Sequence, residues 1–374
     1  MRLSRTVLAL LGVLLTALVT TPPVLAEPDL HARVDTAVAA TLADMGVPGA
    51  IVGLSVPGRL DYIRALGVAD TASGRAMTID DHTRIGSVTK TFTGTVVLQL
   101  VDEGRIRLSD PISQYVAGVP SGDEITLDML GRMRSGLVNY TEEDEFASGL
   151  FTESPAGPYA FTPSVPELLG LSFRRPLNFP PGSRFEYSNT NTLLLGLVIE
   201  KVTGSPLDQV LRQRVLEPLG LTQTTYPDNG FMPEPYARGY AKIPDGTVGD
   251  STLWNPSWAG AAGEIVSNYA DLAVWARAVG RGDLLTPATQ ASRMRMQDGF
   301  PGATYGFALL DSGGWVGHGG TIPGYTTIVA YLPDADATLV VLVNSNVPAK
   351  HAASQIATAV TSLATQDHVF YPGI

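Results

Sequence analysis

Ser87 and Lys90 are the first side chains whose types and spacing could carry out chemistry. They lie three residues apart in the stretch RIGSVTK, residues 84–90, which leads into an apolar pattern at helical spacing. On a helix this separation puts both side chains on one face, so the amine can reach the hydroxyl. Burial can lower the pKa of a lysine until the amine acts as a base toward serine. The alternative is a serine that caps a helix, followed by a solvated lysine.

Tyr187 and Asn189 form a second candidate pair. They follow the turn at Pro181-Gly182 and precede a helical pattern over residues 192–202. In extended backbone, residues two apart face the same side, so we expect both side chains to project into a cleft. A phenol can exchange a proton, and an amide can donate to a carbonyl. Taken alone, the pair fits better a core tyrosine and a turn or cap asparagine.

A glycine-rich stretch, VGHGGT at residues 316–321, ends a strand-like run. Its glycines would let a substrate backbone lie against the strand, with His318 and Thr321 supplying polar contacts beside Gly319 and Gly320. The alternative is a glycine-rich hairpin turn. The chain has five histidines, and none shows the H-E-x-x-H spacing or another metal-binding spacing. The sequence therefore disfavours a zinc hydrolase.

Composition narrows the chemistry further. The chain has 374 residues and no cysteine, which excludes disulfides, thiolate metal sites and a cysteine nucleophile. Any covalent catalysis must use oxygen or nitrogen. The chain carries 36 acidic against 25 basic residues, a net charge of −11. Such a balance works against a nucleic-acid partner.

The first 26 residues have the features of a secretory signal peptide. Arg2 and Arg5 precede an apolar run from Val7 to Val19, and small or modest side chains lead to Ala26. The run is shorter than the roughly 20 residues that span a bilayer. We expect cleavage after Ala26 and a secreted chain of residues 27–374 without a stable membrane anchor. An uncleaved N-terminal anchor is the alternative.

Hydrophobic patterns predict an α/β protein of the α+β type. An antiparallel sheet flanked by helices would be built from both ends of the chain, with a mainly helical region inserted between them. The expected helices and strands are a helix over 30–45, strands over 50–56 and 61–68, helices and loops over 87–204, strands over 303–310, 314–318, 325–332 and 338–344, and a helix over 349–365.

The three motifs, taken in this order, resemble those of the serine penicillin-recognising enzymes. The pattern is S-x-x-K at Ser87, Y-x-N at Tyr187 and H-x-G at His318. The resemblance is strongest to exported D-alanyl-D-alanine carboxypeptidases of the class C β-lactamase type. It implies an α/β lobe (residues 27–86 and 245–374) and an all-helical lobe (residues 87–244), with the site between them.

The resemblance also implies roles for individual residues. Ser87 would attack the substrate carbonyl, and Lys90 and Tyr187 would share the proton transfers. Either Lys90 or Tyr187 could be the general base. The remaining implied contacts are Asn189 on the substrate amide, the backbone N–H groups of Ser87 and Thr321 as oxyanion hole, His318, Gly319 and Gly320 beside the substrate, and Trp258 and Thr141 lining the cleft. A monomer without cofactor or metal, acting on a small peptide, ester or β-lactam, is expected.

One departure concerns the substrate. Where similar carboxypeptidases place an arginine that grips a terminal carboxylate, this chain has residues 309–311, LLD, and Gly319 lacks the hydroxyl of those peptidases. Arg281, Arg293 or Arg295 could fold back to replace the missing cation. Without it, amides or esters that lack a free carboxylate should be hydrolysed at least as well as D-alanyl-D-alanine peptides.

Several functions therefore remain open. Relatives with the same motifs include esterases, D-amino-acid amidases and β-lactamases, and a non-catalytic binder of cell-wall peptides or penicillin could use the same cleft. The presence of Ser87, Lys90, Tyr187 and Asn189 together favours an enzyme. The acidic run at residues 142–145, EEDE, is typical of a solvated loop, and a role in substrate selectivity is the alternative.

Overall fold

The computed structural model describes residues 29–371 apart from 151–152, 155–156, 159–160, 228, 244–245 and 348–350. For residues 153–154 and 157–158 it describes the backbone alone. The predicted signal peptide, residues 1–26, lies outside the described part of the chain.

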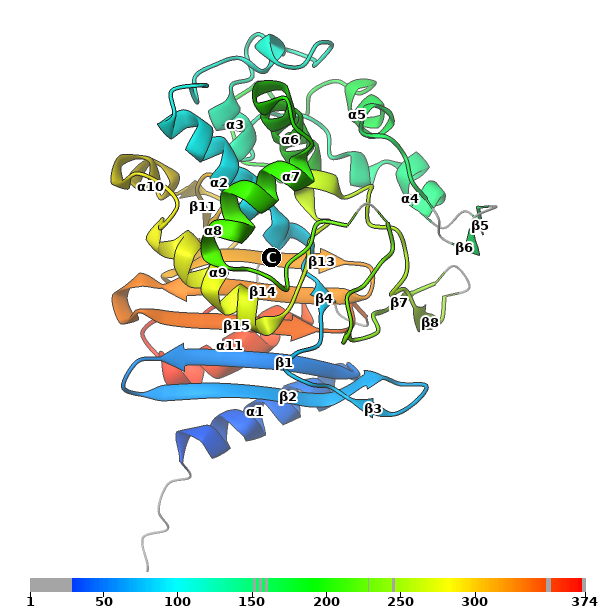
Figure 1. Ribbon diagram of the computed structural model, residues 1–374, viewed down its shortest axis with the longest axis vertical. Helices are drawn as coiled ribbons and strands as arrows, with labels where there is room; N and C mark the ends of the chain where they lie inside the picture. The colour runs from blue at the N-terminus through cyan, green and yellow to red at the C-terminus, as the bar shows by residue number, and fades with distance from the viewer. Residues whose placement is uncertain are drawn as a thin grey trace, which may run out of the picture.

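A nine-stranded antiparallel sheet forms the centre of the molecule (Figure 1). Its strand order is β10-β11-β12-β13-β14-β15-β1-β2-β3, so the pairing of β1 with β15 joins the two ends of the chain. This confirms the predicted sheet. The strands are β1 (Gly49–Val56), β2 (Leu60–Asp70), β3 (Arg75–Ala76), β10 (Gln297–Asp298), β11 (Thr304–Tyr305), β12 (Leu310–Ser312), β13 (Trp315–Ile322), β14 (Tyr325–Leu332) and β15 (Ala337–Val343).

Helices cover both faces of the sheet. The longer helices are α1 (Leu30–Met45), α2 (Thr89–Asp102), α5 (Val165–Phe173), α6 (Asn189–Thr203), α9 (Tyr269–Arg281) and α11 (Ala352–Ala364). Helices α1 and α11 pack on one face, where Leu339 and Val341 of β15 point. Helix α9 packs on the other face, with Val340 and Leu342. Alternate residues of β15 thus enter two separate cores, as expected for a buried strand.

Shorter elements complete the chain. They are β4 (Thr83–Arg84), η1 (Gly86–Val88), η2 (Ile112–Gln114), α3 (Leu127–Gly131), η3 (Tyr140–Glu142), α4 (Asp144–Leu150), β5 (Glu153–Ser154), β6 (Gly157–Pro158), α7 (Leu207–Leu211), η4 (Arg212–Leu216), α8 (Glu217–Leu219), β7 (Tyr240–Lys242), β8 (Val248–Asp250), η5 (Gly260–Ala262), β9 (Val266–Ser267), α10 (Pro287–Arg293) and η6 (Pro333–Ala335). The predicted lobe boundaries at residues 87 and 245 stay a prediction. None of the helices described here has both the length and the apolar character to cross a membrane.

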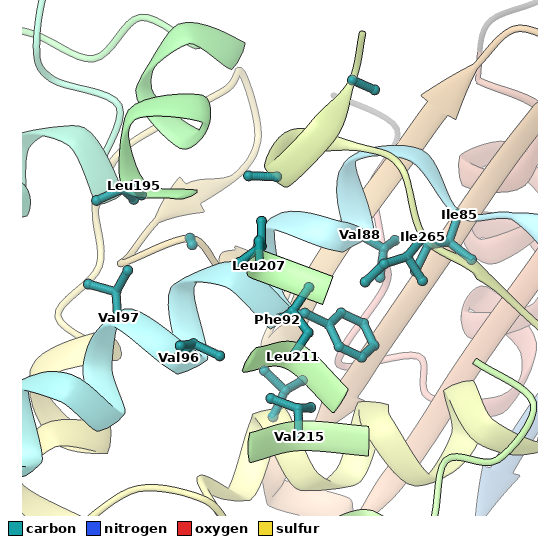
Figure 2. Packing of buried hydrophobic residues seen from close by; sticks show 14 of the residues in the cluster. Ile85, Val88, Phe92, Val96, Val97, Leu195, Leu207, Leu211, Val215 and Ile265 are labelled. Atoms are coloured by element: carbon teal, nitrogen blue, oxygen red, sulfur yellow. The ribbon is translucent and has the colours of Figure 1, made fainter. Parts of the chain in front are cut away.

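Helix α2 is buried around nearly its whole circumference, which fixes the position of the Ser87 motif at its start. Figure 2 shows Phe92 and Val96 of α2 close to Leu211 and Val215 from the helices of residues 207–219. The ring of Phe92 also stacks on Trp275 of α9, with ring centroids 3.9 Å apart. Because every side of α2 is packed, a shift of its first turn would disturb the core.

The predicted strand over residues 303–310 is wrong in part. The chain leaves the sheet after Tyr305, turns so that Gly306 N–H donates to Leu309, and returns as β12. Ala308 at the turn has a φ of 49° and donates its N–H to the carbonyl of Gly131 in the helical region. Phe307 packs beside Gly131, so a contact distant in sequence replaces strand pairing here.

Candidate active site

The sequence around Ser87 places this residue at the point where η1 becomes α2. Lys90 lies one turn later and is fully buried, with its Nζ 2.9 Å from Ser87 Oγ. The same nitrogen lies 2.7 Å from Asn189 Oδ1 and 2.8 Å from the carbonyl oxygen of Ala262. The structure therefore brings the first and second motifs into direct contact.

Burial sets the charge of Lys90. The amine has polar partners but forms no hydrogen bond to a carboxylate among the described residues, and burial lowers its pKa well below the ordinary value. A neutral amine has two N–H bonds and one lone pair. If Asn189 Oδ1 and Ala262 O accept the two hydrogens, the lone pair faces Ser87 Oγ. This arrangement lets Lys90 take the hydroxyl proton.

Asn189 is held in one orientation by its neighbours. Its Nδ2 donates to Asn139 Oδ1 at 3.3 Å and to Thr141 Oγ1 at 3.2 Å. The amide oxygen is therefore left to face Lys90. Thr141 touches the site through Asn189, whereas a direct contact of Thr141 with substrate stays a prediction.

Tyr187 places its hydroxyl in the same buried region. The hydroxyl is solvent-inaccessible, and Lys90 Nζ lies 4.9 Å from the centroid of the Tyr187 ring. Burial raises the pKa of Tyr187, and the Ser87 side chain acts more weakly in the opposite direction. The phenol therefore keeps its proton at neutral pH and can supply it to a neighbouring atom.

The expected backbone of the second motif is wrong in one respect. Asn189 is the first residue of α6, after the N-cap residue Ser188, whereas an extended segment was predicted for Tyr187 and Asn189. The two side chains nevertheless border the same cleft. A strand is therefore not needed to bring them together.

Two glycines let η1 lie against β13. A Cβ on Gly320 would stand 2.0 Å from the carbonyl oxygen of Ile85 and 3.2 Å from Ser87 N. A Cβ on Gly86 would stand 3.0 Å from Thr321 N, and Gly86 also has a φ of 50°, which favours glycine. The backbones that carry the N–H groups of Ser87 and Thr321 are therefore adjacent. Beyond Gly317, β13 has no pairing with β12, so one edge of residues 318–322 has no strand beside it within the described part of the chain.

His318 is buried behind this edge. Its Nδ1 lies 2.6 Å from the carbonyl oxygen of Gly319, and its Nε2 lies 3.0 Å from Tyr305 Oη. Burial lowers the pKa of His318 to about 3. The ring is therefore uncharged at neutral pH.

A cleft of about 470 Å³ connects these residues. Its lining contains seven predicted site residues, which are Ser87, Tyr187, Asn189, His318, Gly319, Gly320 and Thr321. Trp258 instead lines a small neighbouring cavity with Arg84, and its carbonyl accepts a hydrogen bond from Tyr140 at 2.7 Å. A contact between Trp258 and substrate stays a prediction.

Several residues of the cleft were missed by the sequence reasoning. They are Phe300, Thr326, Thr327, His351, Ala353 and Ser354, and no motif marks them. Glu142 is different, because it belongs to the acidic run for which a solvated loop was the favoured interpretation. It is exposed but lines the cleft, and its Oε1 accepts a hydrogen bond from Asn139 Nδ2 at 3.1 Å.

No arginine or lysine is among the described residues that line the cleft. Arg293 is buried elsewhere and donates to Thr95 Oγ1 and to the carbonyl of Thr91. Arg281 bonds Asp336, and Arg295 bonds Ser292. None of the three thus supplies a cation to the cleft. The described part of the chain also has no group of three or more histidine and acidic side chains arranged for a metal ion.

Comparisons with known proteins find a matching family model and several similar structures. A family model described as Beta-lactamase matches residues 34–361. A structure of a D-stereospecific amidohydrolase from a Streptomyces species is 34% identical, has a TM-score of 0.75, and aligns with 84% of this chain and 94% of its own. A D-amino acid amidase from Ochrobactrum anthropi SV3, complexed with D-phenylalanine, is 28% identical with a TM-score of 0.77 and aligns with 91% of this chain and 98% of its own.

A third similar protein points to another substrate. An Escherichia coli K12 protein, provisionally named a D-alanyl-D-alanine carboxypeptidase, is 26% identical over 310 residues, which are 72% of this chain and 69% of the relative. Proteins similar to this chain thus carry names that assign different substrates.

Proposed function

The chain belongs to the beta-lactamase family and has the fold of its serine hydrolases, and we propose a function from this premise. The protein is an amidohydrolase that works through an acyl-enzyme on Ser87. Its substrates are amides or esters whose acyl part carries a free amino group. A free carboxylate on the leaving group is not needed.

The contacts at Ser87 support the following sequence of steps. Neutral Lys90 takes the hydroxyl proton while Ser87 Oγ attacks the carbonyl carbon. The N–H groups of Ser87 and Thr321 stabilise the oxyanion that develops. A proton passes to the leaving nitrogen or oxygen from Lys90 or through the Tyr187 hydroxyl, and the acyl group stays on Ser87. Water then attacks the ester and releases the acid.

The observation that carries the substrate choice is the charge of the cleft. Glu142 brings a carboxylate to the lining, it forms no salt bridge within the described chain, and no arginine or lysine faces it there. A carboxylate in this position attracts an ammonium and repels a carboxylate. Asn139 bonds both Glu142 and Asn189, so the ammonium site and the amide site share one scaffold.

The names of the two amide-hydrolysing relatives agree with this proposal. A D-alanyl-D-alanine carboxypeptidase is the alternative, and it requires that a terminal carboxylate be bound without a paired cation. Leaving an ion unpaired in a partly buried site is costly. The described cleft therefore supports the amidase better than the carboxypeptidase.

Glu142→Gln tests the proposal. With an amino acid amide that has a free amino group, we expect kcat/KM to fall about tenfold, because a charge-assisted contact that is partly exposed is lost. With the N-acetylated amide, which has no ammonium, the variant should match the wild type. Glu145→Gln is the control, since Glu145 belongs to the same acidic run but pairs with Arg174.

A second measurement separates the two candidate functions. It compares kcat/KM for one D-alanyl-D-alanine peptide with its C-terminus free and amidated. We expect the amidated peptide to be hydrolysed at least as fast. A preference of about a hundredfold for the free acid, near 2.7 kcal/mol, would show that a carboxylate-binding cation exists and that the carboxypeptidase is the correct function.

A further inference from the structure

His318 and Tyr305 form a buried pair directly behind the cleft. Tyr305 is fully buried, His318 is 1% exposed, and their rings meet edge to face with centroids 5.8 Å apart. The Tyr305 hydroxyl lies 3.0 Å from His318 Nε2. The sequence pattern predicts His318 as a polar contact for substrate, and it indicates no role for Tyr305.

The direction of each hydrogen bond follows from the partners. The carbonyl of Gly319, 2.6 Å from His318 Nδ1, can only accept, so Nδ1 carries a hydrogen. In an uncharged imidazole Nε2 is then an acceptor, and Tyr305 must donate to it. Both nitrogens of His318 are thereby occupied by protein groups. The ring has no further N–H with which to bind a substrate.

We propose that Tyr305 is a positioning residue that holds His318 as the uncharged Nδ1–H tautomer, and that it thereby prevents the third motif from binding anionic substrate groups. The inference rests on the proposed function, in which the cleft selects against a carboxylate. It explains how a histidine can stand at this position without supplying the missing cation.

The groups around His318 favour the uncharged ring. Burial lowers its pKa most, and the charge of Arg293 at the end of α10 acts in the same direction, while the bond to Gly319 acts in the opposite direction. A proton on Lys90 of α2 would lower the pKa of His318 further. Tyr187 faces it with ring centroids 6.2 Å apart. In the wild type, a hydroxyl also fills the site where a second proton would attach.

Tyr305→Phe removes only that hydroxyl. The ring can keep its contacts with Phe185 and Phe300, whose centroids lie 5.4 Å and 6.4 Å from it. Nε2 of His318 then loses its donor and becomes free to take a proton or to exchange tautomers. A proton there would place a positive charge beside the cleft, and this would happen more as the pH falls.

The first test reads the ring directly. With ¹⁵N-labelled histidine, side-chain NMR of the wild type should show His318 as the Nδ1–H tautomer, unchanged from pH 5 to 8. In Tyr305→Phe we expect His318 to titrate or to change tautomer within that range. Tyr62→Phe is the control, because Tyr62 of β2 is also a buried tyrosine with a hydrogen-bonded hydroxyl, which donates to Asp35 and not to His318.

The second test reads specificity. The ratio of kcat/KM for a peptide with a free C-terminus to that for the amidated peptide should rise at least tenfold in Tyr305→Phe between pH 8 and pH 5.5. In the wild type and in Tyr62→Phe the ratio should stay constant. The NMR measurement needs no turnover, so it tests the hydrogen-bonded pair even if the proposed amidase activity is absent.

Three outcomes would overturn the inference. The first is a wild-type His318 that titrates between pH 5 and 8. The second is a Tyr305→Phe variant in which His318 keeps its tautomer and does not titrate. The third is a variant in which the titration or tautomer of His318 changes but the substrate ratio does not. If Tyr305→Phe does not fold, the wild-type spectrum alone decides the question. The Nε2–H tautomer or the doubly protonated ring would contradict a His318 held by Tyr305 as the Nδ1–H tautomer.

Discussion

Lys90 shows how a single buried residue links catalysis to stability. Its pKa is lowered by burial, so the amine is neutral at pH values where a solvated lysine is charged. As the pH falls through the lowered pKa, Lys90 gains a proton and can no longer act as the base. We therefore expect the acid side of the pH–rate profile to follow Lys90, while Tyr187 stays protonated throughout.

The same shift predicts a pH dependence of stability. In the unfolded chain Lys90 has its ordinary pKa of 10.5, so between the lowered folded value and 10.5 the unfolded state binds more protons. Stability must then rise with pH across this window. The wild type should gain Tm relative to Lys90→Met as the pH is raised from 7 to 10. A constant Tm difference would contradict a neutral, buried Lys90.

At the scale of elements, the approach of η1 to β13 builds the oxyanion site. Gly320→Ala would bring a methyl group to within 2.0 Å of the carbonyl of Ile85, so η1 and Ser87 must move. We expect kcat to fall about a hundredfold, because small displacements and lost oxyanion donors each have effects of this size. Steady-state kinetics and thermal unfolding would measure the change.

Gly170→Ala is the matched control for that variant. Gly170 lies in α5, and a Cβ there meets nothing within 4 Å. Its kinetics should equal those of the wild type, and its stability should not fall. A Gly320→Ala enzyme with unchanged kcat would show that η1 can move without loss, against the account given for the oxyanion hole.

The elements that could be predicted are those with a strong local pattern. The α1 helix, the β1–β2 hairpin and the strands β14 and β15 each bury a regular set of apolar residues, and the structure confirms them. The turn at residues 306–309 could not be predicted, because Ala308 and Phe307 pair with Gly131 in a distant helix. Local periodicity carries no information about such a contact.

The residues of the site also fall into those that the sequence could predict and those that it could not. Ser87, Lys90, Tyr187 and Asn189 lie in short motifs whose spacing suggests their chemistry. Glu142 could be named only as part of an acidic run, because its place in the cleft depends on a hydrogen bond to Asn139. Phe300 reaches the cleft and Tyr305 reaches His318 behind it only through folding of the chain, and no spacing in the sequence indicates these contacts.

At the scale of the whole molecule, the sheet joins β1 and β15, the first and the last of the described strands along the chain. Residues 1–26 precede α1, which packs on α11 at the outer face of the sheet (Figure 1). We predict export with cleavage after Ala26, so that secreted material begins at Glu27. Intact mass and N-terminal sequencing of the protein from the medium would check this. A mature chain that begins at Met1 would contradict the prediction.

The central claim is that Ser87 forms the acyl-enzyme. Its most direct test is intact-mass analysis after exposure to penicillin and to a fluorophosphonate, followed by peptide mapping. We predict one adduct per chain on the peptide that contains Ser87, no adduct in Ser87→Ala, and at least about a thousandfold loss of kcat in that variant. An adduct on another residue, or full activity in Ser87→Ala, would contradict it.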